Sequence, residues 1–173
     1  MPLGSRSLAA VVSVLCAMAA GSGVAQAVSP ATAPRKPIVV QSSIRGVALG
    51  MTPNEVRSQL GPPASTRVET SPIIGKIRLW RYHGLRISFD SVRAGRTVLS
   101  VSSTSKRDRT HAGVGVASSE ADVERFVRGA RCLTRYGYRS CIVGSLRPGH
   151  VVTDFSISGA RKVSRVTLSR VVD

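Results

Sequence analysis

Aromatic and histidine residues are scarce in this sequence. Its 173 residues include one Trp, three Tyr and three Phe, so a core must consist mainly of Val, Leu, Ile and Ala side chains. The histidines, His83, His111 and His150, are each isolated from other metal-ligating residues at the usual spacings. No G-x-S-x-G, S-x-x-K or phosphate-binding glycine loop is present. The sequence therefore predicts a protein without enzymatic activity, cofactor or metal site.

Long apolar runs are also lacking. A membrane-spanning helix needs about 20 apolar residues, whereas Leu8–Ala20 is an uncharged run of 13 residues. It follows Arg6 and is followed by the small-x-small sequence that begins at Ala25 and ends at Ala27. This order predicts a cleavable secretory signal peptide over residues 1–27; the alternative is an uncleaved anchor. We expect a secreted protein, or one of the extracytoplasmic cell envelope, with no transmembrane segment after cleavage.

Acidic residues are few: 9 Asp and Glu stand against 25 Lys and Arg. Because Arg6 lies in the signal peptide, residues 28–173 hold 24 basic and 9 acidic side chains, a net charge of +15. Such a charge favours anionic partners, either an acidic protein surface or an anionic envelope polymer or lipid. The basic residues are dispersed and mostly Arg, a bias that a GC-rich genome also produces. No specific nucleic-acid binding is therefore expected.

Three cysteines are present, and one of them, Cys16, lies in the signal peptide without the small preceding residue that lipidation requires. The remaining pair, Cys132 and Cys141, predicts a disulfide in an exported chain. A turn at Tyr136-Gly137 would place the two directly opposite each other in a hairpin. In the alternative, Cys132 ends a helix and the bridge joins helix to strand. Two cysteines without a nearby His do not complete a zinc site.

Two stretches of the chain are similar at an offset of 67 positions. Gly46–Val56 reads GVALGMTPNEV, and Gly113–Val123 reads GVGVASSEADV. Later, Gly95–Val98 and Ala160–Val163 correspond at an offset of 65. Agreement at both ends of the unit favours an internal duplication; the alternative is chance similarity between two Val- and Ser-rich stretches.

Each stretch contains the signature of a helix start. Thr52 and Glu55 form a capping box, as do Ser119 and Asp122. Capping explains both hydroxyl residues, so neither is required as a nucleophile. Alternating apolar patterns then predict strands at residues 76–83, 85–90 and 97–103, and again at 141–146, 151–158 and 162–171.

The predicted fold class is α+β, with two tandem units that each consist of a helix followed by an antiparallel sheet. The expected organisation is a signal peptide at 1–27, a Pro-rich mobile linker at 28–43, a first unit at 44–105, a basic connector at 106–112 and a second unit at 113–173.

The first unit carries a recognisable pattern of glycines, helix-start residues and aromatic residues. It comprises Gly46, Gly50, Met51, Thr52, Glu55, Val56, Leu60, Gly61 and Pro63, followed by Trp80 and Tyr82. This pattern resembles the small modules of the SmpA/OmlA (BamE-like) family, and two units in tandem resemble the beta-lactamase inhibitory protein (BLIP-like) family. The resemblance covers nearly all of residues 44–172 and implies a helix-backed sheet that grips a partner protein. The first unit departs from the inhibitor family because it has no Cys pair.

The candidate binding residues combine aromatic and Arg side chains, a composition typical of interface hot spots. They are Arg78, Trp80, Tyr82 and Arg86 on one sheet face, with Tyr136 and Tyr138 beside a hairpin turn. This assignment assumes that Ile77 and Leu79 face the helices. The alternatives are a buried core position for Trp80, and packing at the turn for the two tyrosines.

The sequence thus predicts a secreted, non-enzymatic protein-binding module that uses a sheet face in the manner of an inhibitor. We expect its partner, which the sequence does not identify, to be an acidic protein. The alternative function is a basic envelope or wall-associated protein held on anionic polymer or lipid, or an envelope-assembly factor.

Overall fold

The computed structural model describes residues 37–71, 75–90 and 96–172, all of which belong to the unit Ala33–Asp173. The predicted signal peptide and its cleavage residues Ala25 and Ala27 lie outside the described residues. In the described part, no helix is long and apolar enough to cross a membrane.

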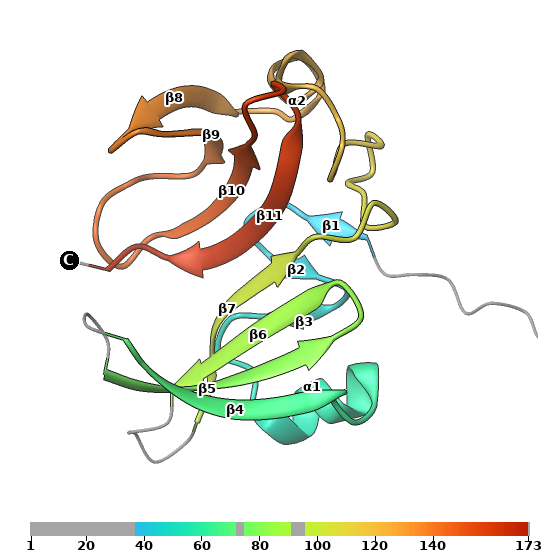
Figure 1. The fold of residues 1–173 in the computed structure, drawn as a ribbon, viewed down its shortest axis with the longest axis vertical. Coiled ribbons are helices and arrows are strands. Elements are labelled where there is room, and N and C mark those ends of the chain that lie inside the picture. Colours follow the sequence, from blue (N-terminus) through green and yellow to red (C-terminus); the bar gives the residue numbers. More distant parts are fainter. Residues whose placement is uncertain (1–36, 72–74, 91–95, 173) are drawn as a thin grey trace, which may run out of the picture. The chain divides into compact units, whose positions relative to one another are not determined.

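Antiparallel strands form most of the secondary structure (Figure 1). The main sheet has eight strands in the order β4-β5-β6-β7-β11-β10-β9-β8, and a second sheet has three short strands in the order β1-β2-β3. The main sheet consists of β4 (Ser65–Ser71), β5 (Gly75–Tyr82), β6 (Leu85–Asp90), β7 (Val98–Ser103), β8 (Arg131–Arg135), β9 (Tyr138–Val143), β10 (Val151–Ile157) and β11 (Val163–Arg170). The second sheet consists of β1 (Ile38–Val39), β2 (Ser43–Ile44) and β3 (Val47–Ala48).

The main sheet is continuous because β7 pairs with β11. Ser103 lies opposite Val166 and Ser100 opposite Ser169, and the hydroxyls of Ser102 and Thr167 are 3.0 Å apart. The predicted α+β class of two tandem helix-plus-sheet units is therefore wrong: the described residues are mainly β, and they form one eight-stranded sheet, a three-stranded sheet and two short helices. The same finding overturns the resemblance to the SmpA/OmlA and BLIP-like families.

The two helices begin where their capping residues predict. In α1 (Pro53–Leu60), the Thr52 side chain accepts a hydrogen bond from the Glu55 amide, and the Glu55 carboxylate accepts one from the Thr52 amide. In α2 (Glu120–Phe126), Ser119 and Asp122 form the same reciprocal pair. Each box satisfies two amides that a helix start otherwise leaves without a partner. The capping interpretation is confirmed for both helices.

The sequence did not predict several of the strands. β4 reads STRVETS and has a single large apolar side chain, so it shows no alternation. β1, β2 and β3 have only two residues each, and Ile38 to Ser43 of the predicted linker belong to them or to the turn between them. The predicted repeat also lacks structural support, because Val47–Ala48 forms β3 whereas Val114 and Gly115 lie outside the named strands.

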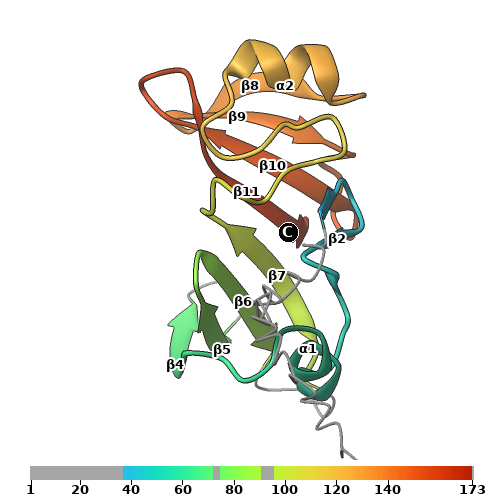
Figure 2. The same cartoon turned by 90° about the vertical axis from the view of Figure 1, so that its right-hand side faces the viewer.

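The two faces of the main sheet differ in what packs on them. We call the face that packs against α1, α2 and the three-stranded sheet the core face, and the opposite one the open face. Figure 2 shows α1 and β2 on the same side of the main sheet. Directly opposite residues share a face, so the pairs Trp80–Ile87, Ile87–Val101 and Val101–Leu168 trace one core-face row. In the described ranges, no helix or strand covers the open face.

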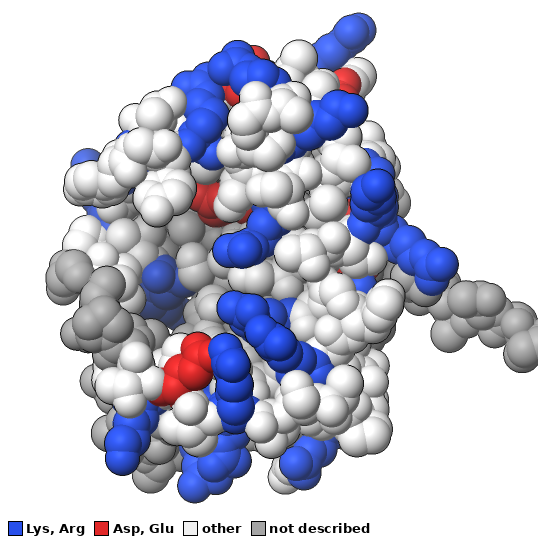
Figure 3. Space-filling model, viewed as in Figure 1, with Lys and Arg blue, Asp and Glu red and all other residues white. Residues whose placement is uncertain are grey.

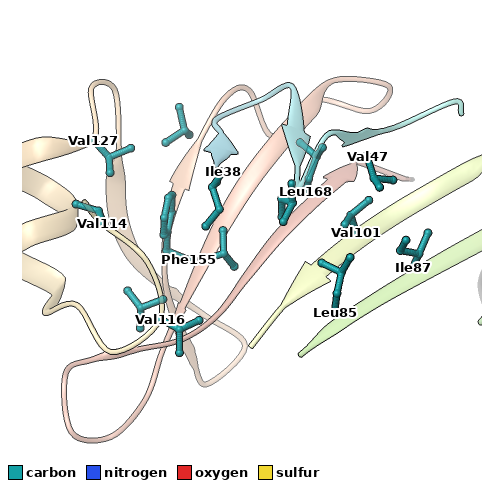
Figure 4. Close-up of a cluster of buried hydrophobic side chains, with 14 of the residues drawn as sticks. Ile38, Val47, Leu85, Ile87, Val101, Val114, Val116, Val127, Phe155 and Leu168 are labelled. Carbon is teal, nitrogen blue, oxygen red and sulfur yellow. The ribbon is translucent and has the colours of Figure 1, made fainter. Parts of the chain in front are cut away.

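One apolar cluster fills the core face (Figure 4). Ile38 and Val47 reach it from the three-stranded sheet, Val127 from the end of α2, and Phe155 from β10. Val47 and Phe155 have no exposed surface. Burying a side chain of this size contributes about 1.5–3 kcal/mol, so this cluster is the main source of stability.

The β8–β9 hairpin has the register predicted from its turn. Arg135 lies opposite Tyr138, and Cys132 lies opposite Cys141. Cys132 and Cys141 form a disulfide, which confirms the predicted bridge and excludes the alternative that joins a helix to a strand.

Candidate functional site: the open face of the main sheet

Of the four candidate binding residues predicted on one sheet face, three lie on the core face, where they are not available to a partner. Trp80 is 2% exposed and its ring centroid lies 4.7 Å from that of Phe89. The Arg57 guanidinium of α1 lies 5.0 Å from the Trp80 ring centroid. Tyr82 donates a hydrogen bond from its hydroxyl to the Gly61 carbonyl at 3.1 Å. Trp80 and Tyr82 therefore belong to the core face, as does Arg78, which is two positions away along the strand.

Arg86 lies on the opposite face from Trp80. The β5–β6 turn at His83-Gly84 pairs Tyr82 with Leu85, so the next pair outward is Arg81–Arg86. Residues that are directly opposite project from the same face, which places Arg81 beside Arg86 on the open face. The assumption that Ile77 and Leu79 face the helices is wrong, and the four predicted residues do not form one surface.

Three arginines meet at a hollow of the open face. Arg81, Arg86 and Arg165 line a cavity of about 260 Å³ together with the hydroxyl residues Ser102 and Thr104. They come from three strands, β5, β6 and β11, and meet because the register aligns these strands with β7 between them. Figure 3 shows this face, on which Lys and Arg are widespread and Asp and Glu are few.

Among the described residues, Arg81 and Arg86 have no counter-ion, whereas Arg165 interacts electrostatically with Asp154. None of Arg81, Arg86 and Arg165 forms a salt bridge or a side-chain hydrogen bond with another residue of the described ranges. Arg81 and Arg86 are directly opposite each other, and like charges at such positions destabilise a sheet. The hollow therefore has the electrostatic character of an anion-binding site, since planar guanidinium groups match carboxylate and phosphate geometry.

A polar row extends from the hollow across the sheet. Arg86 lies opposite Ser102, Ser102 opposite Thr167, and Thr167 opposite Asp154. Next to this row, the hydroxyls of Ser88 and Ser100 are 2.6 Å apart. The middle of the open face thus offers hydroxyl groups that donate and accept hydrogen bonds.

Asp154 is the acidic residue at the other end of this row. The Ser156 hydroxyl donates to its Oδ1 at 2.9 Å, and Ser140 supplies a second side-chain hydrogen bond. Burial raises the pKa of Asp154, because a desolvated carboxylate is less stable than a carboxylic acid. The two serine hydrogen bonds and the charge of Arg165 act in the opposite direction, but burial has the larger effect.

The second candidate set, at the β8–β9 turn, is accessible. Tyr136 is 88% exposed and Tyr138 is 80% exposed, so neither tyrosine packs at the turn. The Arg135 guanidinium lies 5.6 Å from the Tyr136 ring centroid. The disulfide, at the fourth residue pair from the turn, limits the conformational freedom of this hairpin. By strand parity Tyr138 projects on the side of the open face.

The buried carboxylate of Glu120 on the core face has a structural role. Glu120 is 4% exposed, accepts a hydrogen bond from Arg139 Nε at 3.1 Å and lies 3.2 Å from Arg161 Nε. The Arg139 hydrogen bond is the main reason that the pKa of Glu120 is lowered. One of its carboxylate oxygens also lies within 4.8 Å of the sulfurs of Cys132 and Cys141. Because those sulfurs are joined in the disulfide and the carboxylate is in ion pairs, this group serves packing and not metal binding.

Arg81, Arg165 and Asp154 were missed in the sequence analysis. The sequence does contain a signal for Arg81, because counting outward from the His83-Gly84 turn pairs it with Arg86. No local signal could place Arg165 or Asp154 beside them, because the β7–β11 pairing joins residues 65 positions apart.

Comparisons with known proteins give distant structural similarity only. No protein family matches this sequence, and no curated protein matches it. An extracellular protein containing an SCP domain from Bacillus anthracis str. Ames is similar in structure with a TM-score of 0.47 and 12% identity, over 70% of this chain and 44% of that chain. A DUF4309 family protein from Bacillus subtilis has a TM-score of 0.43 and 15% identity, over 78% of this chain and 87% of that one.

Proposed function

We propose that this chain is a secreted, non-enzymatic binding module whose open sheet face binds an acidic segment of a partner protein. The observation that carries the proposal is the hollow lined by Arg81, Arg86 and Arg165. Sheet stability does not explain three guanidinium groups around one cavity, since among the described residues only Arg165 has an acidic side chain, Asp154, acting on it. A carboxylate in the hollow would supply the missing charge and accept charge-assisted hydrogen bonds, which are about twice as strong as neutral ones.

The distribution of charge favours a protein over a uniform polyanion. Asp154 and Glu69 lie on the same face as the arginines, as their cross-strand pairs show. A polymer with an anionic group at every repeat would be repelled at these carboxylates, whereas a protein segment carries charges of both signs. The exposed hairpin residues Tyr136 and Tyr138 add aromatic surface of the kind that anchors protein interfaces.

Export is supported by two features of the chain. The leader pattern over residues 1–27 is that of a signal peptide, and Cys132 and Cys141 form a disulfide, which is typical of proteins in oxidising compartments.

The experiment compares two double variants of residues 28–173. Arg81→Gln with Arg86→Gln removes two charges from the hollow, and Arg125→Gln with Arg128→Gln removes two exposed charges at and just after α2. The probes are a fluorescent Gly-Ser peptide that contains two Glu residues, and inorganic polyphosphate, with polarisation measured at about 0.15 M salt. We expect the hollow variant to lose peptide binding at least tenfold and the matched control to keep it.

Two results would contradict the proposal. Equal loss of peptide binding in both double variants would mean that net charge, and not the hollow, attracts the peptide. Binding of polyphosphate with no measurable binding of the peptide would favour attachment to an anionic polymer.

A further inference from the structure

The polar row on the open face has opposite charges at its two ends. Arg86 begins it, Ser102 and Thr167 form the middle, and Asp154 ends it, each residue directly opposite the next. These residues lie on four adjacent strands, β6, β7, β11 and β10. Adjacent strands are about 4.8 Å apart, so the row from Arg86 to Asp154 spans about 14 Å.

The length of this row matches the distance between residues i and i+4 of an extended polypeptide. A strand-like segment advances about 3.4 Å per residue, so four residues cover about 14 Å. Because side chains alternate, positions i, i+2 and i+4 of such a segment point to the same side. A segment lying along the row would therefore place three side chains on the open face, at the hollow, at the hydroxyl pair and at Asp154.

Asp154 has capacity for a partner of its own. A carboxylate offers about four acceptor positions, and the side chains of Ser156 and Ser140 account for two of them. The charged group that faces it from the neighbouring strand is Arg165, which also lines the hollow. If Arg165 pairs with a carboxylate in the hollow, Asp154 loses part of the cationic charge that stabilises it. A cationic side chain from the ligand would restore that charge.

We infer that the open face binds an extended segment in which an acidic residue and a Lys or Arg lie four positions apart, with a small polar residue midway between them. The acidic group occupies the hollow of Arg81, Arg86 and Arg165, and the basic group pairs with Asp154. This inference rests on the proposed function, and it specifies the sequence class of the segment and that the segment runs across the strands. The partner is thus a protein segment of mixed charge, not a uniformly acidic one.

The test uses fluorescent Ser-Gly peptides that differ only in one basic position. The first has Glu at i and Lys at i+4, the second has Gln in place of that Lys, and the third has the Lys moved to i+3. In an extended peptide, position i+3 points away from the sheet. We expect residues 28–173 to bind the first peptide about fivefold more tightly than the other two, which corresponds to about 1 kcal/mol.

Two variants separate this inference from the proposed function. Asp154→Asn is expected to bind all three peptides with equal affinity, close to that of the wild type for the Gln peptide. Arg81→Gln with Arg86→Gln is expected to lose binding of all three. Glu124→Gln, the same carboxylate-to-amide change at an exposed position of α2, is the matched control away from the open face, and the fivefold preference should persist in it.

Each contrary outcome has a distinct meaning. If the wild type binds the Lys and Gln peptides equally, and only the arginine variant weakens binding, the two-point inference fails while the hollow keeps its proposed function. If Asp154→Asn retains the preference, Asp154 is not the second contact and the inference is wrong. If the wild type binds none of the peptides, both proposals are wrong.

Discussion

Arg45 donates hydrogen bonds from Nε to both carboxylate oxygens of Asp108, at 2.8 and 2.9 Å. The Arg45 side chain is 19% exposed and that of Asp108 is 1% exposed. Ser103, the last residue of β7, also donates its hydroxyl to Asp108. The buried carboxylate therefore joins three segments: the β2–β3 turn, the end of β7 and the connector that leads to α2.

Removal of Arg45 is expected to destabilise the protein strongly. Arg45→Met would leave the Asp108 carboxylate buried with only a hydroxyl as partner, and breaking a buried pair in this way costs about 3–5 kcal/mol. The measurement is the free energy of unfolding in urea. Arg67→Met is the matched control, because Arg67 and Glu69 form an ion pair with side chains 57% and 35% exposed, and exposed pairs contribute at most about 1 kcal/mol. Equal effects in the two variants would contradict the structural role of Asp108.

Trp80 is expected to determine stability and not ligand contact. Trp80→Ala would leave a cavity beside Phe89 and remove the stacking of Arg57, at a cost of about 3–5 kcal/mol. Tyr138→Ala, at an 80% exposed position, should change the unfolding free energy by less than about 0.5 kcal/mol. A small effect at Trp80 together with a large one at Tyr138 would reverse the assignment of these residues.

The sequence predicted those features that depend on neighbouring residues. Both capping boxes, the β6 strand over Leu85–Asp90 and the Cys132–Cys141 hairpin follow from interactions within about ten residues, and the structure shows each of them. The fold class was wrong because it depends on whether β7 pairs with β11, a contact that local patterns do not encode.

The candidate site was predicted less well for a related reason. Strand parity decides which side chains share a face, and a shift by one residue transfers every side chain to the other face. The turn at His83-Gly84 places Tyr82 opposite Leu85, so Trp80 and Arg86 project to opposite sides. Of the six candidate residues, Arg86 and the two exposed tyrosines of the β8–β9 turn lie at the surface as expected.

Loss of the disulfide is expected to destabilise the protein moderately. The bridge closes a loop with a sequence separation of 9, for which the chain-entropy model gives about 2–3 kcal/mol. Cys132→Ser combined with Cys141→Ser should therefore lower the urea midpoint and increase amide hydrogen exchange in β8 more than in β7. An equal increase in amide exchange in all strands of the sheet would instead indicate that the bridge stabilises the whole fold.

Stability is expected to fall in acid through Glu120. The Arg139 hydrogen bond lowers the pKa of this carboxyl in the folded state, so Glu120 stabilises the fold above its ordinary pKa. That contribution is lost as the pH falls through the lowered value. The unfolding free energy of the wild type should decrease between about pH 5 and pH 3, and the decrease should be smaller in Glu120→Gln. An identical pH profile in the variant would exclude Glu120 as the cause.

The contribution of Asp154 to stability is expected to have the opposite pH dependence. Burial raises its pKa in the folded state, so the fold binds this proton more tightly than the unfolded chain does. Its favourable contribution is present in acid and is lost as the pH rises through the raised value. Asp154→Asn should therefore have a higher urea midpoint than the wild type at pH 7, with a difference that shrinks toward pH 4. A lower midpoint at pH 7 would show that the ionised carboxylate is stabilising.

The pairing of β7 with β11 has a consequence for how this chain acquires its structure. Each of these strands also belongs to a hairpin of neighbouring strands, β6–β7 or β10–β11, that can form early because its loop is short. The contact between Ser102 and Thr167 closes 65 positions of chain, and the entropy of that closure must be overcome before the apolar cluster is complete. We therefore expect the joining of the two halves to limit the rate of refolding, and until it occurs each half would expose an unpaired strand edge to other copies of itself.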